Sequence, residues 1–106
     1  MLKVAICEDD DFFRDKLKQY LEKILEDITN NFEIITFNSG EDLVENYPED
    51  IDIYFLDIEM NKLTGMDVAR KIREVDDNVE IIFTTALVDY VHEGYEVRAY
   101  RCATCC

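Results

Sequence analysis

The chain has 106 residues, of which 25 are Asp or Glu and 11 are Lys or Arg, so its formal net charge is -14. This length supports one domain with a single hydrophobic core, and the negative charge repels nucleic acid and anionic membranes. No apolar run approaches the roughly 20 residues that span a bilayer, and the first residues show no signal-peptide pattern. We therefore expect a cytoplasmic chain that binds neither membranes nor nucleic acid directly.

The first half of the chain alternates strand and helix patterns. Residues 2–7 are almost wholly apolar and stop at Glu8-Asp9-Asp10-Asp11, which is typical of a buried strand that ends at carboxylates. From Phe13 to Ile28, apolar residues recur at steps of three and four, which predicts an amphipathic helix opened by the aspartates. Residues 32–37 read as a second strand. The segment Ser39-Gly40-Glu41-Asp42 then carries the start signal of a short helix that runs through Tyr47 and is closed by Pro48.

The second half repeats this alternation. Residues 51–57 form an apolar run that stops at Asp57, which predicts a strand buried on both faces. Thr64-Gly65-Met66-Asp67 carries a second helix start signal, and the helix that follows should point Met66, Ala69, Ile72 and Val75 inward. We expect a fourth strand over residues 79–83, ending in Thr84-Thr85-Ala86, a weaker helix from about 89 to 93, and a last short strand near 99–103.

Five strands that alternate with four helices require parallel pairing through right-handed crossovers. The predicted fold is therefore an α/β, flavodoxin-like doubly wound sheet with helices on both faces and the strand order 2-1-3-4-5. Such a fold would have a fifth helix after the last strand, but the sequence given stops at Cys106. We expect this last helix to be missing, so that one face of the sheet lacks part of its cover.

Carboxylates follow two strands that are neighbours in this order. Glu8 and Asp9 come after the first strand and Asp57 after the third, so they should meet at the edge of the sheet where ligands bind in such folds. Packed carboxylates repel each other unless a cation neutralises them, and Mg²⁺ prefers such oxygen ligands. A carboxylate is also a competent nucleophile toward phosphorus. On composition alone, the same acidic residues fit helix caps and solvated turns better.

Three motifs together resemble the receiver domain of two-component response regulators: Val4-Ala5-Ile6-Cys7-Glu8-Asp9-Asp10, the strand that closes on Asp57, and Ile81-Ile82-Phe83-Thr84-Thr85-Ala86. The resemblance covers residue 2 to about residue 100. Two further segments, Arg70-Lys71-Ile72-Arg73 after Gly65-Met66-Asp67, and Tyr95-Glu96-Val97-Arg98-Ala99, resemble the subgroup that carries a LytTR-type DNA-binding domain.

The resemblance implies a role for each matching residue. Asp57 would accept a phosphoryl group from a histidine kinase and would also bind the metal. Asp9, Glu8 and the main-chain carbonyl of Glu59 would complete the Mg²⁺ site, and Thr85 would supply the hydroxyl that follows the phosphoryl group. Thr84 is the alternative to Thr85 by one position. The chain would be a phosphorelay switch that controls an output, transcription, and would catalyse only its own phosphorylation and slow hydrolysis.

The end of the chain departs from this family. Receivers carry a lysine and a proline after the fifth strand and an aromatic residue three positions earlier, whereas these positions fall on Cys105, Cys106 and Cys102. We interpret residues 1–106 as a receiver domain that lacks its C-terminal end, with free thiols in a reducing compartment. A homodimer formed through the uncovered face near residues 95–106 is expected. The competing interpretations are a pseudo-receiver that only mediates protein contacts and a small aspartate-nucleophile phosphatase.

Overall fold

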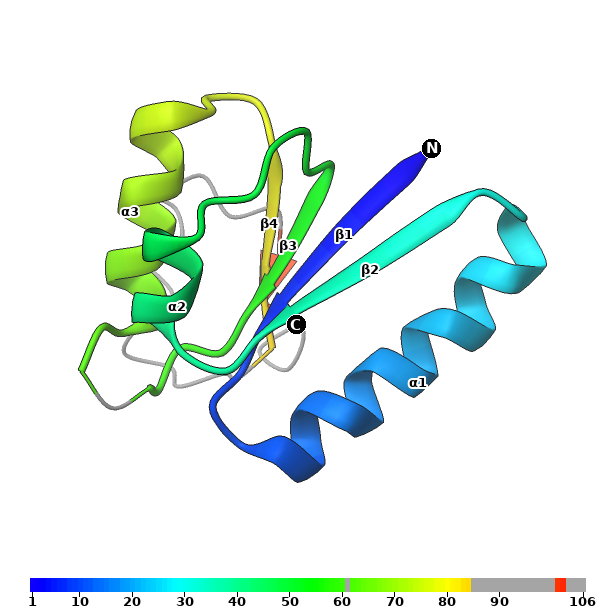
Figure 1. The fold of residues 1–106 in the computed structure, drawn as a ribbon, viewed down its shortest axis with the longest axis horizontal. Helices are drawn as coiled ribbons and strands as arrows, with labels where there is room; N and C mark the ends of the chain where they lie inside the picture. Colours follow the sequence, from blue (N-terminus) through cyan, green and yellow to red (C-terminus); the bar gives the residue numbers. More distant parts are fainter. Residues whose placement is uncertain (61, 85–100, 103–106) are drawn as a thin grey trace.

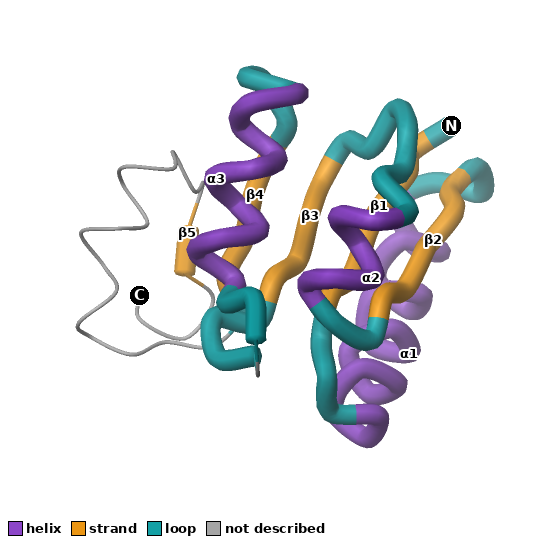
Figure 2. The backbone as a smooth tube through the Cα atoms, turned by 60° about the vertical axis from the view of Figure 1, so that its left-hand side comes forward, coloured by secondary structure: helices purple, strands orange, loops and turns teal. Residues whose placement is uncertain are grey.

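The computed structural model describes residues 1–60, 62–84 and 101–102, which form a parallel sheet with helices on both faces (Figure 1). The sheet runs between α1, which packs on β1 and β2, and the pair α2 and α3, which lies on the opposite face (Figure 2). In chain order the elements are β1 (Leu2–Cys7), α1 (Asp11–Ile28), β2 (Phe32–Phe37), α2 (Gly40–Glu45), β3 (Ile53–Leu56), α3 (Gly65–Val75), β4 (Glu80–Phe83) and β5 (Arg101–Cys102).

The strand order is β2-β1-β3-β4-β5, and every neighbouring pair is parallel. This confirms the order predicted from the sequence. β1 lies between β2 and β3, so that Val4 is opposite Ile34 on one side and Ile53 on the other. The main-chain N–H of Lys3 donates to the Asp52 carboxylate at 2.9 Å and fixes the start of the β1–β3 pair.

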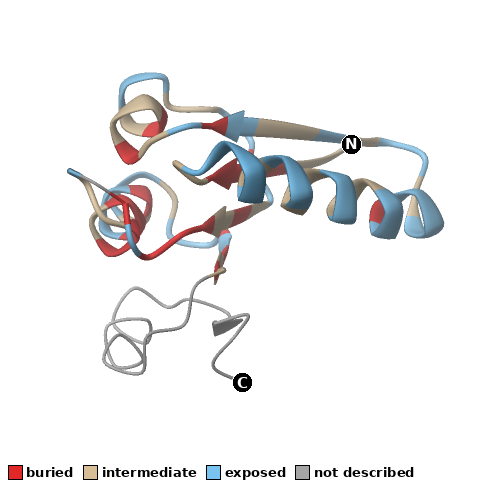
Figure 3. Cartoon of the chain, turned by 90° about the horizontal axis from the view of Figure 1, so that it is seen from below, coloured by how far each residue is buried: buried red, intermediate tan, exposed pale blue. Residues whose placement is uncertain are grey.

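The main core lies between the sheet and the α2–α3 layer. Alternate side chains of β3 and β4 point into it and are fully buried, as strand geometry requires. They pack with residues of α2 and α3, whereas much of α1 faces solvent (Figure 3). The central members of this core are Tyr54, Leu56, Ile81, Phe83, Leu43, Val68, Ala69 and Ile72.

The three predicted helix starts are confirmed. The Asp10 side chain accepts a hydrogen bond from the Phe13 N–H at the start of α1, and Ser39 accepts one from Asp42 at the start of α2. α3 begins with a full capping box, in which Thr64 and Asp67 each bond the other's main-chain N–H. These side chains satisfy N–H groups that have no partner inside the helix.

Three details of the prediction are wrong. Val75 is 70% exposed because it is the last residue of α3, where no further turn of the helix covers it. Val68 lies two turns earlier on nearly the same side of the helix and is fully buried. α2 ends at Glu45, where Asn46 caps it, so Tyr47 lies outside the helix. β3 is not buried equally on both faces: Ile53 and Phe55 are half-buried, since α1 packs on β1 and β2.

The helix predicted over residues 89–93 lies outside the described residues. The last predicted strand is present as the short β5, which pairs with β4. Among the described residues, no helix has the length and apolarity that a bilayer crossing requires.

Candidate functional site

The carboxyl ends of β1, β3 and β4 meet at one edge of the sheet. Parallel pairing aligns Cys7 with Leu56, so the chain leaves both strands side by side. The ladder continues beyond the strands, since the Asp57 N–H donates to the Cys7 carbonyl at 3.1 Å and the Thr84 N–H donates to the Leu56 carbonyl at 2.9 Å. Residues that directly follow these strands are therefore held at fixed positions by the main chain.

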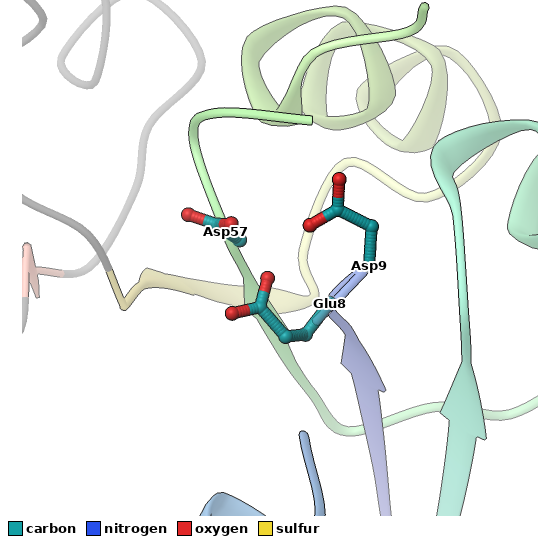
Figure 4. A group of neighbouring side chains, drawn as sticks. All are labelled: Glu8, Asp9 and Asp57. Atoms are coloured by element: carbon teal, nitrogen blue, oxygen red, sulfur yellow. The ribbon is translucent and has the colours of Figure 1, made fainter. Parts of the chain in front are cut away.

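Glu8, Asp9 and Asp57 form a compact acidic cluster at this edge. One carboxylate oxygen from each lies within 4.8 Å of the others, and Figure 4 shows the three side chains around a common space. Asp57 is only 7% exposed and is the one buried charged residue in the described part of the chain. The structure thus brings together the three carboxylates that the sequence placed at neighbouring strand ends.

The carboxyl group of Glu8 has a strongly raised pKa. Its pKa is raised from 4.5 to about 8, chiefly by burial and then by the hydrogen bond and charge of Asp57 and the charge of Asp9. Its Oε2 atom is shielded from solvent and has no hydrogen-bond partner among the described residues. The raised pKa of Glu8 favours its protonated form in the metal-free site, and a proton there relieves part of the repulsion.

The neighbouring Cys7 thiol is buried and free. Burial, followed by the charges of Glu8 and the surrounding aspartates, raises its pKa to about 12. Its Sγ donates to the Ser39 carbonyl at 3.2 Å and lies 3.6 Å from the Met60 sulfur. Cys7 consequently stays protonated and belongs to the core beneath the acidic cluster.

The start of α3 packs directly on the main chain of Asp57. A Cβ atom added at Gly65 would lie 2.2 Å from the Asp57 carbonyl oxygen and 2.9 Å from the Ile58 Cα. The Gly65 N–H donates to the Ile58 carbonyl at 3.0 Å, and the Glu59 N–H donates to Asp57 Oδ1 at 3.3 Å. These contacts fix the turn that carries Asp57, and only glycine leaves enough room for them.

The start of α1 is tied to the same edge by Arg14. Its guanidinium donates to the Glu8 carbonyl at 3.0 Å and also pairs with Asp11. Because Asp10 caps the helix, the first turns of α1 stand beside the acidic cluster.

A groove of about 620 Å³ runs from the acidic cluster along α1. Thr84 lies on its wall, with its hydroxyl 3.4 Å from the Leu56 carbonyl. Thr85, which the resemblance implied as the site hydroxyl, lies outside the described residues. The described residues that line the groove are Glu8, Asp9, Asp10, Phe13, Lys16, Leu17, Tyr20, Asp57, Glu59 and Thr84.

The donor set of this cluster suits a hard divalent cation such as Mg²⁺. Carboxylate oxygens from two neighbouring strand ends converge, and one of them, Glu8 Oε2, is buried without a hydrogen-bond partner in the described part of the chain. Such an oxygen is costly to bury unless a donor or a cation faces it. Asp9, Asp57 and Glu8 are the side chains that would hold the ion; the Glu59 carbonyl stays a prediction.

Comparison with known protein families agrees with this geometry. The response regulator receiver domain matches residues 4–104. The chain belongs to this receiver family. This confirms the resemblance seen in the sequence, and receiver domains are signalling modules of two-component systems.

Individual relatives support the assignment. The receiver is 35% identical over 105 residues to the sensory transduction protein LytT of Bacillus cereus, a match that covers 93% of this chain but 39% of LytT. The response regulator TrrA of Thermotoga maritima, solved in complex with Mg²⁺-BeF, superposes with a TM-score of 0.79 at 27% identity, covering 95% of this receiver and 84% of TrrA. The complex of TrrA with the histidine kinase ThkA gives 0.76 at 25% identity, with coverage of 95% and 83%.

Sequence reasoning missed residues of the receiver that only the packing reveals. Gly65 was seen as part of a helix cap, whereas it also makes room for the Asp57 turn. Phe13 and Tyr20 were assigned to the apolar positions of the predicted helix and Lys16 to the polar residues between them, whereas all three line the same groove as Asp57. Asp10 was the sequence feature that could have shown this. A helix capped directly after the acidic end of a strand has to start beside the site, so its first turns lie next to that site.

Proposed function

We propose that this receiver accepts a phosphoryl group on Asp57 in a Mg²⁺-dependent reaction, with a sensor histidine kinase as the donor. The observation that carries the proposal is the burial of the Asp57 carboxylate within 4.8 Å of two further carboxylates. The Mg²⁺-BeF complex and the kinase complex of TrrA support the metal and the type of partner.

The proposed transfer uses a carboxylate as the nucleophile. An oxygen of Asp57 attacks phosphorus, the bond from phosphorus to the donor's histidine nitrogen breaks, and the donor leaves with the bonding electrons. Asp57 keeps the phosphoryl group as an acyl phosphate. When bound, Mg²⁺ would offset the negative charge of the carboxylates and the phosphoryl oxygens.

The residues around Asp57 have positioning roles in this proposal. Gly65 and the Glu59 N–H hold the Asp57 turn, and Arg14 holds the main chain at Glu8. Thr85 is the proposed hydroxyl for the phosphoryl oxygens, with Thr84 as the alternative. The chain would catalyse no reaction other than its own phosphorylation and slow hydrolysis.

The chain spans 39% of the length of the LytT protein that it matches. We propose that its phosphorylation controls an output, transcription, through a DNA-binding domain of the full-length protein, and that it acts in the cytoplasm. A pseudo-receiver that only mediates protein contacts is the alternative.

Intact-mass analysis tests the proposed function. After incubation with acetyl phosphate and Mg²⁺, we expect one phosphate adduct in the unchanged chain, none in Asp57→Asn, and an undiminished one in the surface control Glu33→Gln. In this assay the bond from phosphorus to the acetate oxygen breaks and acetate leaves. An adduct that persists in Asp57→Asn would place the nucleophile elsewhere, and no adduct in any variant would favour the pseudo-receiver.

A further inference from the structure

The groove beside Asp57 is larger than a phosphoryl group requires and has two chemically different walls. Its acidic wall comes from the ends of β1 and β3, and its other wall comes from Phe13, Lys16, Leu17 and Tyr20 on α1. α1 therefore faces any donor molecule that approaches Asp57. A residue on this helix is placed to act on the donor rather than on the acceptor.

The groove is strongly negative, whereas phosphoryl donors are anions. Five acidic side chains line it, from Glu8, Asp9, Asp10, Asp57 and Glu59. Even with a divalent cation at the cluster, an incoming phosphoryl group meets excess negative charge. A positive side chain on the groove wall would lower this repulsion and would favour the developing charge of the transfer.

Lys16 is the only cationic side chain among the described residues that line the groove. Arg14 stands nearby, but its guanidinium is held by the Glu8 carbonyl and by Asp11. The Lys16 ammonium lies 5.4 Å from the centre of the Phe12 ring, and its side chain forms no ion pair within the described part of the chain. Because Lys16 is exposed, its long side chain exchanges rapidly between rotamers and can leave this ring.

We propose that Lys16 binds the phosphoryl oxygens of the phosphodonor in the groove and thereby speeds transfer to Asp57. This inference rests on the proposed function, because it assigns a further residue to the same reaction. The ammonium makes its contact with the donor's oxygens while the Asp57 oxygen attacks phosphorus. In the structure the Lys16 ammonium lies over the Phe12 ring, which does not line the groove, so it has to leave this ring to reach the donor.

The test compares phosphorylation rates at saturating Mg²⁺ and a fixed low concentration of acetyl phosphate. Lys16→Met keeps the apolar stem and removes the charge, Lys16→Glu reverses the charge, and Lys16→Arg restores it. The matched control is Lys23→Met, which removes the same charge from an exposed position of α1 that does not line the groove. Thermal melts establish that each variant is folded.

We expect Lys16→Met to react about tenfold more slowly and Lys16→Glu more slowly still, with Lys16→Arg within about threefold of the unchanged chain. Removing one hydrogen-bond donor from a closed catalytic site lowers the rate roughly 10²- to 10³-fold. The loss expected here is smaller, because Lys16 is exposed to solvent and its charge is screened. Lys23→Met should react at the unchanged rate. Added salt should slow the unchanged chain more than Lys16→Met.

Two negative results are distinguishable. If the unchanged chain accepts phosphate on Asp57 and Lys16→Met reacts as fast as Lys23→Met, this inference is overturned and the proposed function stands. If the unchanged chain takes up no phosphate on Asp57, both fail together.

Discussion

Asp57 combines burial with close neighbours of the same charge, a combination that costs stability in the absence of a cation. We expect Asp57→Asn to leave the metal-free fold as stable as the unchanged chain, or up to about 1 kcal/mol more stable. Its Mg²⁺ affinity should fall at least about tenfold. Urea unfolding in a chelator and Mg²⁺ titrations followed by amide shifts measure the two effects.

Glu33→Gln, at an exposed residue of β2, is the control for the loss of one charge. It should change neither the stability of the metal-free fold nor the Mg²⁺ affinity. Unchanged Mg²⁺ affinity in Asp57→Asn, or amide signals around Asp9 and Asp57 that stay still at millimolar Mg²⁺, would refute the assigned metal site.

Glu8 gives the metal-free protein a specific pH dependence. Its pKa is raised from 4.5 to about 8 on folding, so the folded state binds the proton more tightly than the unfolded state. The stability that this proton contributes is complete below about pH 4.5 and is lost as the pH rises toward about 8. In Glu8→Gln, which has no proton to lose, the unfolding free energy should fall less across this range.

Urea unfolding with a chelator at pH 5, 6.5 and 8 measures this difference. Parallel pH profiles of the two proteins would contradict it. Mg²⁺ affinity should show the opposite pH dependence to stability. Because the ion and the proton compete for Glu8, this affinity should rise with pH.

At the scale of elements, the contact between the start of α3 and the Asp57 turn makes a sharp prediction. In Gly65→Ala the new methyl group would overlap the Asp57 carbonyl, so the helix has to move. We expect a loss of about 2 kcal/mol or more in unfolding free energy and weaker Mg²⁺ binding, because the turn that carries Asp57 shifts with the helix.

Gly40→Ala is the comparison variant. Its added Cβ would lie 2.8 Å from the Leu63 carbonyl and from a Val68 methyl group, and it does not touch the Asp57 main chain. Stability should fall in both variants, whereas Mg²⁺ affinity should fall only in Gly65→Ala. Equal Mg²⁺ affinity in the two would show that the α3 contact does not position Asp57.

Local sequence patterns predicted most elements because their causes are local. The apolar run of β1 and the caps Ser39 and Thr64 act over a few residues, and the strand order then brought Glu8, Asp9 and Asp57 together. The prediction for Val75 was wrong because spacing gives the side of a helix but not where the helix ends, and Val75 is the last residue of α3. Gly65 and Lys16 could not be assigned from spacing, since their roles depend on which elements touch.

At the scale of the whole molecule, exposed apolar residues gather on α1. Tyr20 is 66% and Ile28 72% exposed, while Ile24 and Phe13 are also open to solvent. Apolar area is worth about 25 cal/mol per Å² when it leaves water, so a surface of several hundred Å² favours association. Apart from β5, the dimer contact predicted from the sequence at residues 95–106 lies outside the described residues, and we extend that prediction to α1.

We expect a dimer in sedimentation experiments under reducing conditions, and Ile28→Glu should shift it toward monomer. Val75→Glu, which places the same charge on an equally exposed apolar position of α3, should not. A monomer at all concentrations would contradict the prediction. A dimer that appears only without reductant would instead be a disulfide product of Cys102, Cys105 or Cys106.

The position of β1 between β2 and β3 also has a consequence for synthesis on the ribosome. β1 emerges well before β3, which is one of its two partners, and the bond from Lys3 to Asp52 spans 49 residues. At roughly 5–20 residues per second, this strand waits several seconds for that partner. During this time its apolar residues can pair only with β2 or be shielded by a chaperone, so we expect the nascent chain to be most vulnerable to aggregation before residue 56 has left the exit tunnel.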